Sequence, residues 1–143
     1  MAAIKQYETD VAIVGAGGAG VAAGIEARDA GARTIAFEKG SEPGGAAITS
    51  GGGCLVVGSP LQHANGIDDT PDLAFKDWIA WGGPSADEVW ARYYIEHSLH
   101  DLYHWAERFG AKWVDLKFQE GKMKADWPYG LAAVVPSCMR WVR

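Results

Sequence analysis

The sequence predicts an α/β fold, and three observations near its start support this prediction. Two apolar runs, residues 11–14 and 34–37, have the length and the Val, Ile and Phe content of buried strands. Residues 15–20 are rich in glycine and lead from the first run into a helical stretch, residues 18–30, that Gly31 ends. A helix that connects two neighbouring strands makes them parallel. This order of elements is that of a Rossmann-like βαβ unit.

The glycine turn has the spacing GxGxxG, which is typical of dinucleotide-binding units. Gly15 allows the tight turn off the strand, Gly17 removes a Cβ so that the backbone can approach a pyrophosphate, and Gly20 lets the helix press against the sheet. The amides and the dipole at the start of the helix then favour an anion. An ordinary glycine turn would explain these glycines alone, but not the strands and helix around them.

An acidic residue, Glu38, follows the second apolar run directly, 23 positions after Gly15 (38 − 15 = 23). At this place in the unit a carboxylate accepts hydrogen bonds from both ribose hydroxyls of an adenosine half. A 2′-phosphate would be repelled there, so the sequence disfavours NADP.

Residues 39–59 do not continue as a nicotinamide-binding domain would. An amphipathic helix and a third parallel strand are expected after the second strand of such a domain. This segment instead has no 3.6-residue periodicity and too many glycines for a stable helix. Ile48 and the apolar residues 55–57 distinguish it from a solvated linker. We expect a loop whose backbone passes close to a large flat ligand, which argues against a nicotinamide dehydrogenase.

At these residues the chain resembles the flavoprotein subunit family of fumarate reductase and succinate dehydrogenase, which includes soluble fumarate reductase-like enzymes and 3-ketosteroid Δ1-dehydrogenases. The specific part of the resemblance rests on residues 10–20, 37–39, 44–46 and 50–53, in that order. It continues more loosely through residues 66–71 and 105–111. Family members more often have Thr or Asn where Ala46 stands, which removes a side-chain hydrogen bond but leaves the backbone contacts.

The resemblance implies bound FAD. The residues that it implies at the diphosphate, the ribose, the pyrophosphate loop and the flavin ring are, in this order along the chain, Gly15, Ala16, Gly17, Gly18, Ala19, Gly20, Glu38, Lys39, Gly44, Gly45, Ala46, Thr49, Ser50, Gly51 and Gly52. It further implies an oxidoreductase that moves a hydride between the flavin and a carbon–carbon bond beside a carbonyl or carboxylate of a small-molecule substrate. Tyr129 stands where the steroid dehydrogenases have an active-site tyrosine, and it is either an acid or base or a packed surface residue.

The whole chain, residues 1–143, is expected to be the N-terminal part of an FAD-binding domain and therefore an incomplete domain. Residues 1–66 would form the dinucleotide-binding unit and flavin loop, and residues 67–143 a helical segment. Residues 136–143 show no closing strand or helix cap. We expect an oligomer or a complementary flavoprotein chain to complete the sheet. The alternative function is a non-catalytic nucleotide-binding subunit or fragment that needs a partner chain to hold flavin.

Two helices and a strand are expected in the second half. The helices are residues 71–81 and 85–109, and the strand is residues 113–118. Ser85 and Glu88 have the spacing of a capping box. The apolar stripe of the second helix consists of Ile95, Leu99, Leu102, Ala106 and Phe109. Its end is expected at Gly110.

Three histidines of the second helix, His97, His100 and His104, are spaced to share one face, where a divalent metal could bind. Three ligands on one exposed helix rarely close a metal site, so we expect a solvated or partner-facing surface and no metal. Cys54 and Cys138 fit no metal or redox spacing and are expected to be free thiols.

Charge and hydropathy limit the partners. The net charge of −5 argues against nucleic acid and anionic membrane surfaces. The N-terminal residues lack the apolar core of a signal peptide, and no apolar stretch is long enough to span a membrane. These features favour a cytoplasmic location.

The chain should bind FAD in preference to FMN, NAD and NADP, because Glu38 suits an unphosphorylated ribose and residues 39–59 suit a flavin dinucleotide. Isothermal titration calorimetry of the purified chain with the four nucleotides would measure this order. NAD binding that is equal to or tighter than FAD binding would contradict it.

Overall fold

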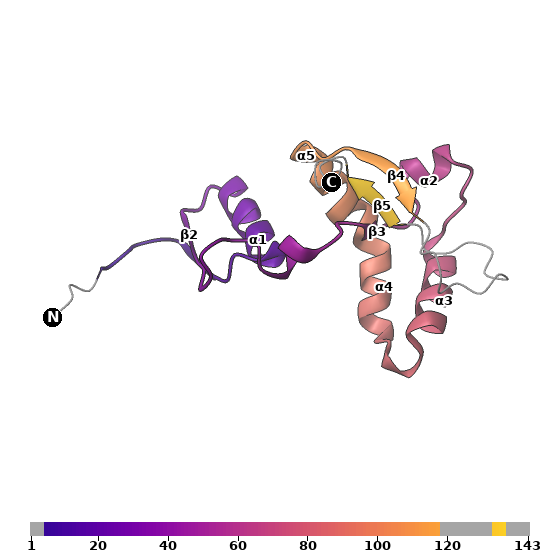
Figure 1. The fold of residues 1–143 in the computed structure, drawn as a ribbon, viewed down its shortest axis with the longest axis horizontal. Helices are drawn as coiled ribbons and strands as arrows, with labels where there is room; N and C mark the ends of the chain where they lie inside the picture. The colour runs from indigo at the N-terminus through magenta and orange to yellow at the C-terminus, as the bar shows by residue number, and fades with distance from the viewer. Residues whose placement is uncertain (1–4, 118–132, 137–143) are drawn as a thin grey trace. The chain divides into compact units, whose positions relative to one another are not determined.

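The computed structural model describes residues 5–117 and 133–136, and the chain forms two compact units, residues 1–50 and 51–143. The first unit contains strand β1 (Val11–Val14), helix α1 (Gly18–Asp29), strand β2 (Thr34–Phe37) and the short 3-10 helix η1 (Gly45–Thr49). β1 and β2 pair in parallel, with Val11 opposite Thr34 and Val14 opposite Phe37, and α1 lies against both strands (Figure 1). The predicted βαβ unit is confirmed.

Helix α1 approaches β1 closely because glycines face the strand. A Cβ at Gly20 would overlap the carbonyl oxygen of Gly15 and lie 3.3 Å from Cγ2 of Ile13. A Cβ at Gly24, one turn further along, would lie 3.1 Å from Cδ1 of the same isoleucine. The role expected of Gly20 in helix packing is therefore confirmed, and Gly24 extends the same contact.

An ion pair joins the starting ends of the two strands. The Asp10 carboxylate accepts hydrogen bonds from Nε and Nη2 of Arg33, at 3.1 and 3.0 Å, and from the Arg33 amide at 2.8 Å. The backbone amides of Asp10 and Val11 donate in return to the Arg33 carbonyl. The Arg33 side chain, followed by its amide, lowers the pKa of Asp10. The pairing of β1 with β2 is thus reinforced where the two strands begin.

The second unit combines helices with a small antiparallel sheet. Its helices are α2 (Pro60–Ala64), α3 (Pro71–Gly82), η2 (Gly83–Ser85), α4 (Glu88–His97), the π-helix η3 (Ser98–His104) and α5 (Trp105–Arg108). Its strands are β3 (Cys54–Leu55), β4 (Trp113–Lys117) and β5 (Ala133–Pro136), with β5 between the other two and antiparallel to both (Figure 1). The helix from Pro71 and the strand from Trp113 are confirmed. The strand at residues 133–136 was not predicted; it is defined by its pairing with β3 and β4, which are distant from it in the sequence.

The described core of this unit consists of two apolar clusters. Val57, Ala74 and Ile95 form one, with Phe75 and Trp78 against them. The other surrounds Val56 and Tyr103 and includes Leu61, Leu99, Leu102, Trp113 and Leu116. The expected stripe is therefore buried at Ile95 and partly buried at Leu99 and Leu102, whereas Phe109 at its end is exposed.

A buried polar network supports these clusters. The side chain of Gln62 accepts hydrogen bonds from the amide and hydroxyl of Ser59, both at 2.7 Å, and donates to Oδ2 of Asp69 at 2.8 Å. All three residues are buried, and burial raises the pKa of Asp69. Because the polar groups satisfy one another, α2 can be capped inside the unit.

Over residues 85–109 the structure differs from the expected single helix in two respects. Asp87 is the N-cap and accepts hydrogen bonds from the amides of Val89 and Trp90 at 3.0 Å, so the predicted Ser85 capping box is wrong. The short Asp87 side chain reaches these amides directly before the helix, whereas Ser85 belongs to the preceding 3-10 turn.

The second difference from the expected α-helix is the π-helix η3. Its wider turn changes the angular spacing of the residues that follow. Trp113 explains part of it: its indole Nε1 donates to the Tyr103 carbonyl at 3.2 Å, and the two rings stack at 4.9 Å. Gly110, with φ of +87°, follows the end of α5, as expected. No helix among residues 5–117 is long and apolar enough to cross a membrane.

Replacing Gly20 by Ala should destabilise the first unit by about 1–3 kcal/mol, because the added methyl group overpacks the contact with Gly15 and Ile13. Gly18→Ala is the matched control: nothing lies within 4 Å of a Cβ there, so its stability should be unchanged or up to about 1 kcal/mol higher. Urea unfolding followed through the Ile13 methyl NMR signals measures both. Equal stabilities would contradict the packing role of Gly20.

Candidate functional site

The glycine turn leaves β1 sharply and ends at the first turn of α1. Gly15 has φ of +94°, a conformation that favours glycine, and its amide donates to the Phe37 carbonyl at 2.7 Å. Gly17 is the N-cap of α1 and has no side chain that could accept a hydrogen bond from the first-turn amides. The first-turn amides of an α-helix have no acceptor within the helix. The start of α1 therefore presents its first-turn amides and the positive end of its dipole, and these features favour an anion.

A second loop lies beside this turn. The Gly44 amide donates to the Ala16 carbonyl at 2.7 Å, and Gly17 and Gly44 form an isolated parallel bridge. Gly44 has φ of +126°, and a Cβ there would lie 2.6 Å from Cγ1 of Ile48. The backbone thus brings Gly44 and Gly45 next to the glycine turn, so these two groups of predicted site residues meet in space.

Glu38 connects the same two regions from the end of β2. Its Oε2 accepts a hydrogen bond from the Ala16 amide and its Oε1 accepts one from the Gly40 amide, both at 2.8 Å. These bonds, with the Gly40 amide contributing most, lower the pKa of Glu38. The carboxylate is therefore ionised at neutral pH. The contact with Ala16 was not predicted, since the fingerprint assigns this acid only to the ribose.

The residues of the turn fit a diphosphate. Gly17 has φ of −76°, which any residue can adopt, and a Cβ there would meet only the Gly44 carbonyl oxygen at 3.9 Å. The folded chain itself therefore does not require glycine at this position. A diphosphate that approaches the start of α1 would require it, because a side chain would occupy the same space.

The remaining predicted ligand residues divide between the two units. Within η1, the Thr49 hydroxyl donates to the Ala46 carbonyl at 3.0 Å, and Ser50 caps the end of this turn. Lys39 is exposed. Gly51 and Gly52 begin the second unit, where Gly52 has φ of +68°.

The sequence around these glycines matches a known protein family. The sequence profile of a family described as an FAD binding domain matches residues 10–142. The chain belongs to this family. FAD is therefore its cofactor, and the uncapped α1, Gly17 and the Gly44 loop are a local geometry that suits it.

The relatives of this FAD-binding domain are larger oxidoreductases. It is 34% identical over 136 residues to a fumarate reductase (cytochrome) of Shewanella frigidimarina, covering 94% of this chain and 24% of the relative. It is 38% identical over 96 residues to an acrylate reductase flavoprotein subunit of Shewanella woodyi, covering 66% and 19%. A 3-ketosteroid-delta4-(5alpha)-dehydrogenase from Rhodococcus jostii RHA1 superimposes with a TM-score of 0.80 and 33% identity, covering 91% and 31%. The chain thus spans about a fifth to a quarter of the length of these two curated relatives.

The histidines of the second unit do not converge on one point. His97 Nδ1 hydrogen-bonds to the Tyr93 carbonyl, His100 pairs with Asp101, and His104 pairs with Glu107. Among residues 5–117, no group of three or more His, Cys, Asp or Glu side chains is placed to hold a metal ion.

Two other sequence expectations concern Tyr129 and the cysteines. Cys54 is a partly buried thiol whose Sγ donates a hydrogen bond to the Gly52 carbonyl at 3.5 Å. Tyr129 and Cys138 lie outside the described residues.

Gly17→Val should weaken FAD binding at least tenfold, about 1.4 kcal/mol or more, because the branched side chain occupies the space of the diphosphate. The variant should fold, since a Cβ at this position meets nothing closer than 3.9 Å. Fluorescence titration with FAD measures the affinity, and circular dichroism checks the fold. A folded variant with unchanged affinity would show that the turn does not hold the diphosphate.

Proposed function

We propose that this FAD-binding domain serves an oxidoreductase that transfers a hydride between flavin and a carbon–carbon bond beside a carbonyl or carboxylate. The relatives support this proposal, because the compounds after which they are named share one chemical feature. Fumarate and acrylate each carry a carboxylate on a double bond, and a 3-ketosteroid carries a ketone near the bond that is oxidised. In each case the carbonyl group can delocalise negative charge from the adjacent carbon.

The residues of the first unit would hold the cofactor. The start of α1 and the turn at residues 15–20 bind the diphosphate through backbone amides, with Gly44 and Gly45 beside them. Glu38 accepts hydrogen bonds from the ribose hydroxyls of the adenosine half. FAD, when bound, supplies the two-electron redox chemistry.

The loop around η1 and the residues after it would contact the flavin ring. Backbone amides between Thr49 and Gly53 stabilise negative charge on the ring, in the way that a fixed set of donors stabilises an oxyanion. Tyr129 is the residue of this chain that we propose for proton exchange with the substrate.

A second candidate function is an FAD-binding subunit that has no catalysis of its own and needs a partner chain, and an exposed sheet face supports the need for a partner. Val14 and Phe37 are partners across the two parallel strands, and they are 90% and 49% exposed. Parallel sheets are normally covered on both faces. A second copy or a complementary flavoprotein chain that covers this face would supply the missing contacts.

The purified chain should therefore bind FAD as an oligomer or with a complementary chain, and the monomer should not turn over substrate. An absorption spectrum and the mass in solution test flavin retention and association together. Fumarate and a 3-ketosteroid, each with an artificial electron carrier, test turnover. A monomer that retains FAD and acts on either compound would contradict the need for a partner. A chain that does not bind FAD under any of these conditions would contradict the proposed function itself.

A further inference from the structure

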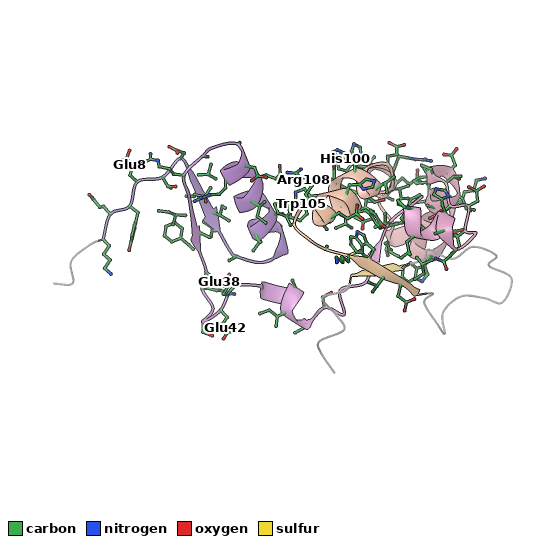
Figure 2. The ribbon with its side chains drawn as sticks, turned by 90° about the horizontal axis from the view of Figure 1, so that it is seen from above. Glu8, Glu38, Glu42, His100, Trp105 and Arg108 are labelled. Atoms are coloured by element: carbon green, nitrogen blue, oxygen red, sulfur yellow. The ribbon has the colours of Figure 1, made fainter. Side chains whose placement is uncertain are left out.

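One carboxylate joins the two loops that form the diphosphate site. Oε2 of Glu38 accepts from the Ala16 amide and Oε1 from the Gly40 amide, at 2.8 Å each. Ala16 lies between Gly15 and Gly17 in the turn after β1, whereas Gly40 lies in the segment after β2. Figure 2 shows Glu38 at the end of β2, with Glu42 further along the same segment. Glu38 therefore links the end of β2 to the turn after β1 through the chain's own hydrogen bonds.

Ala16 also contacts the Gly44 loop through its carbonyl. Its amide donates to Glu38, and its carbonyl accepts from the Gly44 amide at 2.7 Å. Ala16 is only 7% exposed, so its amide has little access to water if the bond to Glu38 is broken. The backbone conformation of this one residue, whose N–H and C=O belong to successive peptide groups, thus affects both Gly17 and the Gly44 loop, which are the two sides of the diphosphate site.

Only an ionised carboxylate suits both contacts. Both partners are N–H donors, and a carboxylate offers an acceptor on each oxygen. A glutamine offers one acceptor, so its NH2 group would face one of the two amides. Each carboxylate oxygen also has a second lone pair, which leaves the ribose contact possible at the same time.

We propose that Glu38 is a positioning residue that keeps the diphosphate-binding turn in its binding conformation before the cofactor arrives, in addition to contacting the ribose. The inference rests on the FAD site described above. It predicts that Glu38 influences the binding of an anion that has no ribose and therefore cannot contact the carboxylate through hydroxyl groups.

Inorganic pyrophosphate is the probe that separates positioning from ribose contact. If Glu38 acts only through the ribose, Glu38→Gln removes a negative charge near the anion and should leave pyrophosphate binding unchanged or make it tighter. If Glu38 positions the turn, the same variant should bind pyrophosphate more weakly despite the lost repulsion. The two roles therefore predict opposite directions.

Glu42→Gln is the matched control, since it removes the same charge from an exposed position in the same segment. Glu38→Asp is a second variant, because it keeps the charge but is one methylene group too short to make both hydrogen bonds unchanged. The backbone amides of β1, residues 11–14, report whether each variant keeps the βαβ unit folded.

The experiment measures pyrophosphate affinity by calorimetry and the hydrogen exchange of the Ala16 amide in the ligand-free full chain. We expect Glu38→Gln to weaken pyrophosphate binding and to speed Ala16 exchange by about tenfold or more, which is the scale of a lost hydrogen bond to a charged group. Glu38→Asp should change both quantities in the same direction, and Glu42→Gln should change neither by this amount.

Ala16 exchange that is unchanged in a folded Glu38→Gln chain would overturn the proposal, whether or not pyrophosphate binding is measurable. Pyrophosphate binding that is equal to or tighter than that of Glu42→Gln would also overturn it. Failure of the wild-type chain to bind FAD would instead contradict the cofactor site and leave the exchange result to decide the role of Glu38 in the turn.

Discussion

The close contact between α1 and β1 is the constraint on which the first unit depends. Gly20 lies directly over the carbonyl of Gly15, so the helix begins as near to the strand end as the backbone permits. This proximity turns the start of α1 toward the carboxyl ends of β1 and β2, which is where parallel α/β sheets bind ligands. The Gly17–Gly44 bridge and the Glu38 contacts then fix the loops around that point.

The first unit could be predicted in detail because its motif is local, and because sterics require glycine at particular positions of this motif. The strands, the helix, the positive φ of Gly15 and the packing of Gly20 all follow from one fingerprint and its apolar flanks. The bond from Ala16 to Glu38 could have been suspected from the same fingerprint. An acid at the end of β2 stands beside the adjacent turn, and the amides of that turn need acceptors.

The second unit was predicted less well, because its details depend on contacts between distant residues. Strand β3 has only two residues, too few to show a periodicity, and it is defined by pairing with β5. The π-helix at Ser98–His104 has no local sequence signal, whereas the stacking of Tyr103 on Trp113 is a tertiary contact. The cap was assigned to Ser85 by a spacing rule, although Asp87 is a good N-cap directly before the helix.

The glycines of α1 link folding to cofactor concentration. Gly20 and Gly24 each lower the intrinsic stability of the helix by about 1 kcal/mol relative to alanine, and α1 has no fully buried side chain to compensate. The helix is therefore stabilised by its packing against β1 and β2, and an anion at its first turn would add to that stability. A ligand that binds only the formed helix shifts this local equilibrium by mass action. The abundance of folded chain in a cell would then follow the supply of flavin dinucleotide.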